Sequence, residues 1–395
     1  MTEAAPARAG LVSYRLEGRL EMLPPALFGQ GEAIIFLPPC PEADPPAEPL
    51  FWLVDEKGRR LALAWPGGAA LDHEDALAAI RIEASFGLPR PLMTRLPVHP
   101  HRLPPRLRAW ARRLLAPKKP AGVCFPRWPI EPSLEAWRHI GQAAGLTGPP
   151  WTWPDGAGCA LCLSHDVDTA VGQKNAEALA EVEESLGLRS VWFLLAGNYE
   201  IDAALWQEMA ARGHEIACHG LNHDFKLGYL PPNKMAARLD KSLARLAQFK
   251  PQGFRTPGFF RTPALMEALA ERFSYDSSLP DTRSQPAPNG CASLFPFRLG
   301  GLTELPVTMP ADGEMIALGL GAYERTALWR EKAGWIKSLG GLIHLLTHPD
   351  PEFTATADER ETYRRFLAEL LDGPEKVWAA LPLQITALAD RADNG

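Results

Sequence analysis

The chain has 395 residues, which at roughly 150 residues per domain allows two domains or one large one. Hydrophobic residues at 46% and charged residues at 22% are ordinary values for a globular protein and exclude wholesale disorder and a fibrous repeat. The net charge of −6 argues against a protein that mainly binds nucleic acid, because such proteins usually carry a basic domain.

The beginning of the chain has no apolar segment behind a basic one, and no later apolar run approaches about 18 residues. The six cysteines are too few for a disulfide scaffold in a chain of this size. We therefore expect a cytoplasmic protein with free thiols and no membrane-spanning segment.

Residues 1–145 are predicted to form an accessory domain of α+β type that is rich in turns. More than half of the 39 prolines lie in residues 1–150, and proline fixes φ and removes a backbone donor. Short apolar runs at 33–37, 50–54 and 61–65 predict strands. Residues 106–115 predict a basic amphipathic helix, whose apolar stripe is expected to dock on the protein, with contact to an anionic membrane as the alternative.

The segment 146–158 is dense in glycine and proline and predicts a linker to a catalytic domain at 159–395. Four apolar runs in that domain alternate with helical patterns at about 174–187, 203–212, 233–249, 263–273 and 323–338. The apolar runs lie at 160–164, 190–197, 215–219 and 341–348. This alternation predicts βα units around a largely parallel sheet, either open or closed into a barrel. Active sites of both architectures lie at the carboxyl ends of the strands.

Polar residues follow two of these runs. Asp166 and Asp168 end the first, and an extended strand would place both side chains on one side. A single aspartate there is an ordinary helix cap, but a pair at the end of a buried strand needs a partner or a metal. His219 and His223 follow the third run, and two histidines with one carboxylate form a common open metal shell.

Two further run ends carry candidates. Arg255 would hold a nearby aspartate ionised and oriented, with a surface salt bridge as the alternative. His348 is the candidate for acid–base chemistry, whereas the neighbouring His344 is expected to be structural. Cys159 and Cys162 lack a second pair of ligands, so a zinc ribbon is rejected.

Taken in order, these residues resemble the NodB-type polysaccharide deacetylases of carbohydrate esterase family four. The motifs that carry the resemblance are D-x-D at 166–168, H-x-x-x-H at 219–223, R-T-P at 255–257, Y-D-S-S at 275–278, E-L-P-V at 304–307 and L-T-H-P at 346–349. The resemblance covers residues 156–372 and no part of 1–145. It implies a distorted (β/α) barrel of seven or eight strands.

The resemblance also implies a divalent metal, usually zinc, with cobalt, nickel or manganese as alternatives. The residues that would bind this metal are Asp168, His219 and His223. By the same resemblance Asp166 would be the general base, Arg255 would tune Asp166, and His348 would be the general acid. The implied reaction removes an N-acetyl or O-acetyl group from an amino-sugar saccharide.

Three departures from the family pattern bear on the substrate. Val167 separates the two aspartates, which resembles a D-V-D branch that includes hydrolases of cyclic amides. Gly258 follows R-T-P where the family commonly has a bulky aromatic residue, which puts one wall of the sugar pocket in question. The family's tryptophan motif is not placed, and packing explains Trp329 and Trp335 as well as stacking on substrate does.

The sequence as a whole predicts a metal-dependent deacetylase that acts on an N-acetylated saccharide. Two alternatives stay open, a hydrolase of cyclic amides or ureides on the same fold and a non-catalytic carbohydrate-binding protein with a relic site. No nucleic acid partner is expected. The sequence indicates neither an oligomeric state nor a chemical role for residues 1–145.

Overall fold

The computed structural model describes residues 12–18, 34–37, 51–54, 57–62, 85–86, 126, 128–131, 152–284 and 289–392. The chain divides into two units, one of residues 1–84 with 131–150 and one of residues 85–130 with 151–395. The basic helix predicted at 106–115 lies outside the described residues. No helix within the described ranges is long and apolar enough to cross a membrane.

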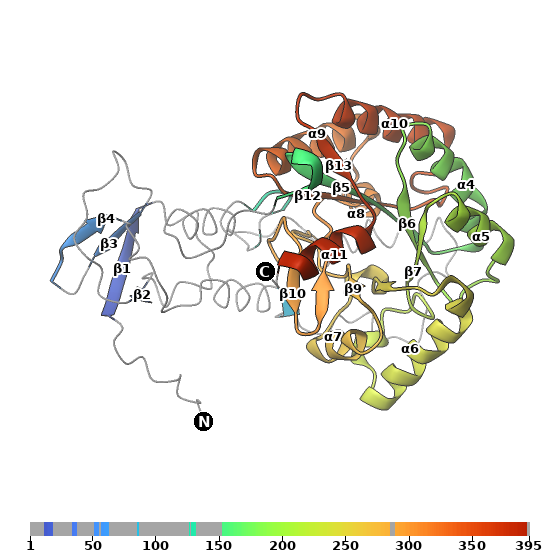
Figure 1. Cartoon of the computed structure of the whole chain (residues 1–395), viewed down its shortest axis with the longest axis horizontal. Helices are drawn as coiled ribbons and strands as arrows, with labels where there is room; N and C mark the ends of the chain where they lie inside the picture. The colour runs from blue at the N-terminus through green and yellow to red at the C-terminus, as the bar shows by residue number, and fades with distance from the viewer. Residues whose placement is uncertain are drawn as a thin grey trace. The chain divides into compact units, whose positions relative to one another are not determined.

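The described part of the first unit is a four-stranded antiparallel sheet in the order β2-β1-β3-β4 (Figure 1). Its strands are β1 (Val12–Gly18), β2 (Ile34–Leu37), β3 (Phe51–Val54) and β4 (Arg60–Ala62). The central strand β1 pairs Arg15 with Ile34 on one side and with Val54 on the other. Strands β2 and β3 therefore lie within the apolar runs predicted at 33–37 and 50–54, whereas β4 overlaps the run predicted at 61–65 only at residues 61 and 62.

The described part of the second unit is built on a nine-stranded sheet that curls into a half-barrel (Figure 1). The strand order is β10-β11-β9-β8-β7-β6-β5-β12, and β13 also pairs with β5. The strands are β5 (Cys159–Val167), β6 (Ser190–Leu194), β7 (Glu215–Cys218), β8 (Gly253–Phe254), β9 (Tyr275–Asp276), β10 (Phe297–Leu299), β11 (Leu302–Glu304), β12 (Leu342–Thr347) and β13 (Val377–Ala379). Within this described sheet every pairing is parallel except that of β10 with β11. The predicted α/β fold with a distorted barrel is thus confirmed.

Helices cover the outside of this sheet (Figure 1) and supply the crossovers that parallel strands require. They are α4 (Ala170–Glu184), α5 (Ala203–Ala211), α6 (Pro232–Leu246), α7 (Pro263–Ala270), α8 (Asp312–Ala317), α9 (Ala322–Ser338), α10 (Ala357–Leu371) and α11 (Pro382–Ala392). Single-turn 3₁₀ helices are η5 (Pro154–Gly156), η6 (Leu227–Tyr229), η7 (Ala247–Phe249) and η8 (Pro257–Phe259). Side chains that cap helix N-termini belong to Thr169, Asp202, Thr262 and Thr356. These caps fix where the chain leaves each strand end and turns into a helix.

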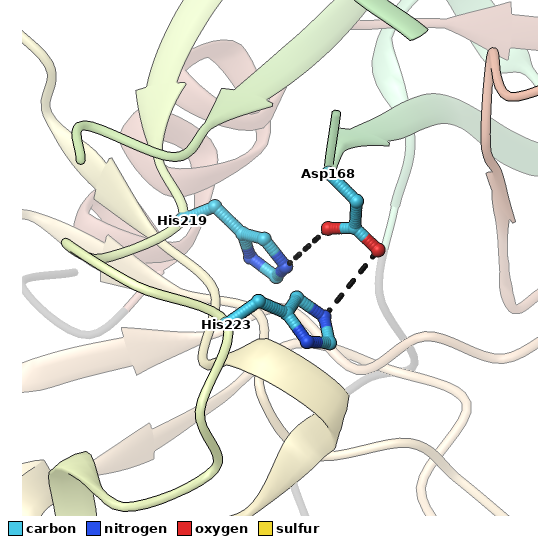
Figure 2. Close-up of side chains that lie close together, drawn as sticks. All are labelled: Asp168, His219 and His223. Carbon is cyan, nitrogen blue, oxygen red and sulfur yellow. Dashed lines mark ion pairs between the residues drawn. The ribbon is translucent and has the colours of Figure 1, made fainter. Parts of the chain in front are cut away.

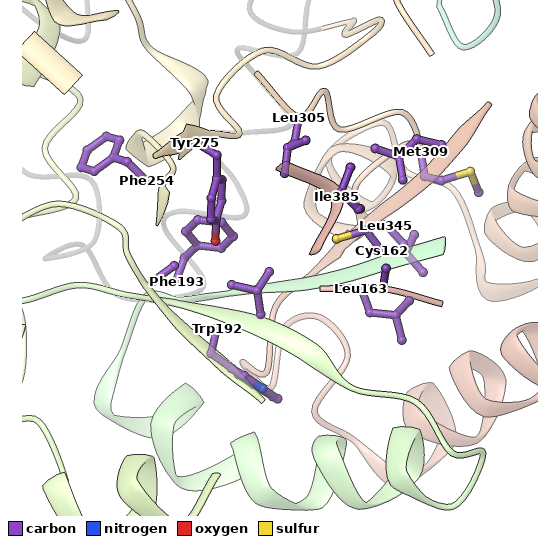
Figure 3. Packing of buried hydrophobic residues seen from close by; sticks show 14 of the residues in the cluster. Cys162, Leu163, Trp192, Phe193, Phe254, Tyr275, Leu305, Met309, Leu345 and Ile385 are labelled. Atoms are coloured by element: carbon purple, nitrogen blue, oxygen red, sulfur yellow. The ribbon is translucent and has the colours of Figure 1, made fainter. Parts of the chain in front are cut away.

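The hydrophobic core fills the inside of the curl and the space between sheet and helices (Figure 3). All nine residues of β5 are buried, which matches the continuous apolar runs typical of parallel strands. In β8, Gly253 leaves room for the ring of Tyr275, because a Cβ at residue 253 would lie 1.8 Å from Cζ of that ring. The four cysteines within the described residues are all buried.

The segment 305–309 links the β9 side of the sheet to β12. The amide of Val307 donates to the carbonyl of Leu279 at 3.3 Å, and the amide of Met309 donates to the carbonyl of His344 at 3.1 Å. These bonds bring the start of α8, which follows directly, to the carboxyl end of β12.

Part of the chain that precedes residue 145 packs within the second unit. The carbonyl of Pro129 accepts hydrogen bonds from the hydroxyl of Thr282 at 2.9 Å and from the ammonium of Lys332. Lys332 is buried and also pairs with the carboxylate of Asp281. Phe86 packs against the hydrophobic core. The second unit therefore includes residues that the sequence assigns to the accessory domain.

Candidate active site

The two aspartates predicted at the first strand end are both present at the end of β5. Asp166 lies in β5 opposite Phe193 of β6, and Asp168 follows the last residue of the strand. Thr169 then caps α4, so the chain leaves the sheet directly after Asp168. Only 4% of Asp166 and 7% of Asp168 is exposed. Carboxylates buried to this degree require charged or hydrogen-bonding partners.

The structure brings His219 and His223 against Asp168, as the sequence predicts (Figure 2). Nε2 of His219 lies 3.5 Å from Oδ1 of Asp168, and Nε2 of His223 lies 3.4 Å from Oδ2. One potential ligand atom from each residue lies within 4.8 Å of the other two. His219 directly follows β7, and the loop that continues from it carries His223 back to the same place.

The donor atoms of this group suit a divalent metal. Oδ1 of Asp168 and Nε2 of His219 are buried and have no hydrogen-bond partner within the described residues. Nδ1 of His219 donates to the carbonyl of Arg255 at 2.8 Å, which leaves the lone pair of Nε2 directed at Asp168. Burial alone would raise the pKa of Asp168, but His223 and His219 together hold that pKa well below its usual range. One aspartate carboxylate with two histidine imidazoles is a ligand set that zinc prefers.

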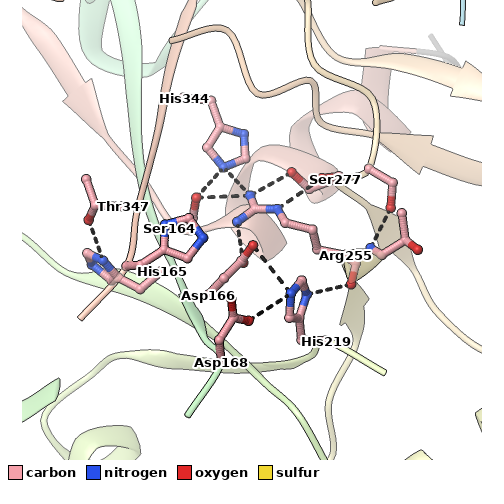
Figure 4. Close-up of polar contacts among 12 residues, drawn as sticks. Ser164, His165, Asp166, Asp168, His219, Arg255, Ser277, His344 and Thr347 are labelled. Carbon is pink, nitrogen blue, oxygen red and sulfur yellow. Dashed lines mark hydrogen bonds and ion pairs between the residues drawn. The ribbon is translucent and has the colours of Figure 1, made fainter. Parts of the chain in front are cut away.

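Asp166 is held by Arg255, the arginine that the sequence singles out (Figure 4). The Arg255 guanidinium donates to Oδ1 of Asp166 at 3.0 Å, and the other carboxylate oxygen lies 3.5 Å from Nε2 of His219. Arg255 is fully buried and also donates to the carbonyl of Ser277 at 3.0 Å and the hydroxyl of Ser164 at 2.9 Å. One oxygen of Asp166 is therefore fixed, while the other faces the candidate metal group.

His348 follows β12 and pairs with a carboxylate that the sequence analysis missed. Nδ1 of His348 donates to Oδ1 of Asp312 at 2.6 Å, and its backbone amide donates to Oδ2 at 2.8 Å. Burial alone would lower the pKa of His348, but the Asp312 carboxylate, with help from Asp168 and Asp166, raises it to about 10. His348 is therefore protonated at neutral pH. The signal for Asp312 is weak, since it is a single carboxylate at the start of the short helix α8.

The remaining candidates from the sequence have packing roles. Nδ1 of His344 donates to the carbonyl of Pro306 at 3.1 Å, and its Nε2 lies 3.2 Å from the Arg255 guanidinium. Burial and then the charge of Arg255 hold the pKa of His344 well below its usual range, so this imidazole is neutral and structural. The indole of Trp329 donates to the carbonyl of Pro310 at 2.8 Å, and its ring packs on Phe366.

An aromatic ring stands beside Gly258, where the sequence put a pocket wall in question. Gly258 has φ of +62°, and a Cβ there would lie 2.6 Å from Cε1 of Phe225. The ring of Phe225 packs edge-on against that of His223 at 4.8 Å and against Phe260 at 4.9 Å. The space next to residue 258 is thus filled from the loop after His223. The sequence analysis missed Phe225, because its contact with Gly258 joins two segments that are distant in the sequence.

Comparison with known proteins finds a family model that matches part of this region. Residues 160–271 match the family described as polysaccharide deacetylase. The matched range includes the strand ends that carry the two aspartates, the two histidines and Arg255, and it stops before His348. A search of curated proteins finds no match.

Solved structures with the same fold include two deacetylases by description. One, from Mycobacterium smegmatis, has a TM-score of 0.53 and 24% identity, over 62% of this chain and 95% of that one. Another, from Pseudomonas aeruginosa PAO1, has a TM-score of 0.51 and 15% identity, over 62% of this chain and 96% of that one. Puue allantoinase has a TM-score of 0.51 and 14% identity, over 68% of this chain and 98% of that one. At these identities the likenesses establish the fold.

Proposed function

Because residues 160–271 match the polysaccharide deacetylase family, whose members hydrolyse carbon–nitrogen bonds other than peptide bonds, we propose that this chain deacetylates an N-acetylated saccharide. The proposal extends to a resident metal, zinc in the first instance, bound by Asp168, His219 and His223. When bound there, such a metal supplies Lewis-acid activation of water and of the amide carbonyl.

Asp166 is the proposed general base. Arg255 fixes Oδ1 of Asp166 at 3.0 Å, which leaves Oδ2 directed at the metal-ligand group to accept the proton of the attacking water. The same ion pair places a permanent positive charge beside Asp166, because the guanidinium does not lose its proton in the working pH range. Burial of Arg255 and its bonds to Ser164 and Ser277 hold this geometry in place.

His348 is the proposed general acid. The leaving group in amide hydrolysis is an amine, which must be protonated to depart at neutral pH. The Asp312 carboxylate keeps His348 charged and holds Nδ1, so that Nε2 is the nitrogen left to donate a proton. The observation that carries the proposal is this combination of one carboxylate held by a cation and one imidazole held by an anion around a single ligand group.

Substitution of the base tests the mechanism. Asp166→Asn keeps the side-chain shape and should lower kcat for acetylated chitooligosaccharides by about 10²- to 10⁴-fold in zinc-loaded protein, while the zinc content stays at the wild-type value. Asp240→Asn is the control, since Asp240 is an exposed partner of Arg272. Unchanged turnover by Asp166→Asn would remove Asp166 from the mechanism.

Ring opening of a cyclic amide is the second candidate function. The D-V-D motif at 166–168 favours this reaction, and Puue allantoinase shares the fold. The same base and acid would serve this reaction, so the substrate separates the two candidates. A side-by-side assay on cyclic imides, ureides and acetylated sugars assigns the bond. Absence of bound divalent metal in the purified protein, with no activation by added zinc or cobalt, would instead favour a binding protein with a relic site.

A further inference from the structure

Two arginines outside the proposed mechanism bind consecutive backbone carbonyls beside the R-T-P-G segment. The guanidinium of Arg283 donates to the carbonyl of Gly258 at 2.5 Å and lies over the ring of Phe259 at 4.8 Å. The guanidinium of Arg261 donates to the carbonyl of Phe259 at 2.9 Å and to Oδ1 of Asn289 at 3.1 Å. Both side chains are therefore fixed against the same short stretch of chain.

Neither guanidinium has a carboxylate within ion-pair distance among the described residues, unlike Arg255 with Asp166 or Arg325 with Glu359. Arg261 is 7% exposed, and its Nε has no hydrogen-bond partner in this part of the chain. Burial, and next the charge of Arg283, lowers the pKa of Arg261 to about 10. A buried cation that repels its neighbour is costly unless an anion compensates it.

The acidic groups near this pair act on it only from beyond ion-pair distance. Glu304 and Asp276 act on Arg261, but burial raises the pKa of both carboxyls and so disfavours their charged forms. Glu314 acts on Arg283, but its Oε1 accepts hydrogen bonds from the backbone amide of Ser284 at 2.6 Å and from the hydroxyl of that residue at 2.7 Å. None of these three carboxyl groups lies within ion-pair distance of either guanidinium among the described residues.

The arginine pair is next to the proposed active site. The carbonyl that binds Arg283 belongs to Gly258, which packs on Phe225, and Phe225 packs on His223. On the other side, Ser284 is bound to Glu314 of α8, two residues from Asp312. The segment 283–284 therefore connects the metal-ligand side of the site with the side of the proposed acid. Arg283, Gly258 and Phe259 are partly exposed, so a ligand can reach them.

We propose that Arg283, with Arg261 behind it, binds an anionic group on the saccharide, a carboxylate or a phosphate, next to the acetyl group that is removed. This inference rests on the proposed deacetylase function and narrows its substrate to acidic N-acetylated saccharides. The planar guanidinium suits carboxylate and phosphate oxygens, which it binds through two parallel hydrogen bonds. Phe259 beneath Arg283 holds the guanidinium plane in a fixed orientation.

The test compares matched acidic and neutral substrates on the zinc-loaded full chain. The carboxylate arm pairs a hyaluronan tetrasaccharide with tetra-N-acetylchitotetraose, and the phosphate arm pairs N-acetylglucosamine 1-phosphate with N-acetylglucosamine. Wild-type protein should prefer the acidic member of at least one pair in kcat/KM. Arg283→Gln should reduce this preference by about tenfold or more, because a hydrogen bond to a charged group is lost. Arg283→Lys should retain part of this preference, since the positive charge remains but the two parallel N–H donors of the guanidinium are lost.

Controls separate binding from folding and from the proposed function. Arg365→Gln, which removes an exposed arginine paired with Glu361, should leave both substrates unaffected. Equal losses on acidic and neutral substrates in Arg283→Gln, or no wild-type preference in either pair, would overturn the inference and leave deacetylation intact. If no acetylated sugar is hydrolysed, binding of the same saccharides to wild type and to Arg283→Gln, measured by calorimetry, still tests the anion site. Binding of the acidic members that requires Arg283 would support the anion site without the deacetylase function, and equal binding would overturn it.

Discussion

Replacing Asp312 with asparagine tests whether its negative charge keeps His348 ready to donate a proton. Asp312→Asn preserves the side-chain shape and removes the charge 2.6 Å from Nδ1 of His348. In the wild-type protein the Asp312 carboxylate outweighs burial and raises the pKa of His348 to about 10. An adjacent opposite charge changes a pKa by about 1 to 3, so we expect the pKa of His348 to fall to about 8 in the variant.

The expected effect depends on pH in a defined way. With a pKa of about 10, His348 is about 90% protonated at pH 9, whereas with a pKa of about 8 it is about 10% protonated there. At pH 6 the imidazole is protonated in both proteins. The ratio of wild-type to variant kcat/KM should therefore be about tenfold larger at pH 9 than at pH 6. If the variant also orients His348 less well, kcat/KM decreases further by a factor that is the same at both pH values.

The assay is kcat/KM of zinc-loaded protein from pH 6 to pH 10, with Thr354→Val as the matched control. Thr354→Val removes a hydrogen bond to Oδ2 of Asp312 at 2.8 Å and leaves the negative charge in place. Its decline in activity at alkaline pH should coincide with that of wild type. If the profile of Asp312→Asn runs parallel to that of wild type, the protonation argument is refuted and Asp312 has only a structural role.

Three further substitutions test the metal group, a buried carboxyl and the aromatic contact. Asp168→Ala should abolish both zinc binding and the rise in Tm that zinc produces in wild type, and a retained rise would contradict the ligand assignment. Burial, against hydrogen bonds from Tyr275 and Leu383, raises the pKa of Glu215 from 4.5 to about 7. The stability that protonated Glu215 contributes is thus fully present below pH 4.5 and is lost as pH rises through 7. In urea unfolding between pH 4.5 and 8, the free energy of unfolding of wild type should therefore fall by about 3 kcal/mol more than that of Glu215→Gln. Gly258→Ala should cost about 1 kcal/mol from its left-handed backbone plus a steric cost with Phe225, and an equal cost in a Phe225→Ala background would argue against that contact.

The residues at strand ends could be predicted because the parallel sheet gathers them without detailed knowledge of the loops. Asp166 and Arg255 are 89 residues apart in sequence, yet each ends an apolar run whose carboxyl end lies at the same edge of the sheet. The alternation of strands and helices is enough to place these ends together. Only the direction of each side chain has to be taken from the structure. For His219 that direction follows from the hydrogen bond of Nδ1, which leaves Nε2 facing Asp168.

Asp312 and Phe225 could not be predicted because neither ends a strand. Asp312 reaches His348 because the segment 305–309 is hydrogen bonded between Leu279 and His344, and this pairing has no periodic signal in the sequence. Phe225 adopts φ of +61°, which is unusual for a residue with a large side chain and turns its ring beside Gly258. The short connections are set by contacts between distant segments, which local sequence patterns do not encode.

The proposed base and acid are each paired with a partner of opposite charge, and both partners come from other parts of the chain. Arg255 follows β8 and holds Asp166 of β5, while Asp312 of α8 holds His348 after β12. Neither partner is near its target in sequence, so both charge pairs depend on how the sheet brings these segments together. Any change that separates segment 305–309 from β12 should therefore impair proton donation before it disturbs the metal-ligand group. Loss of activity with full zinc content is the expected signature of such a change.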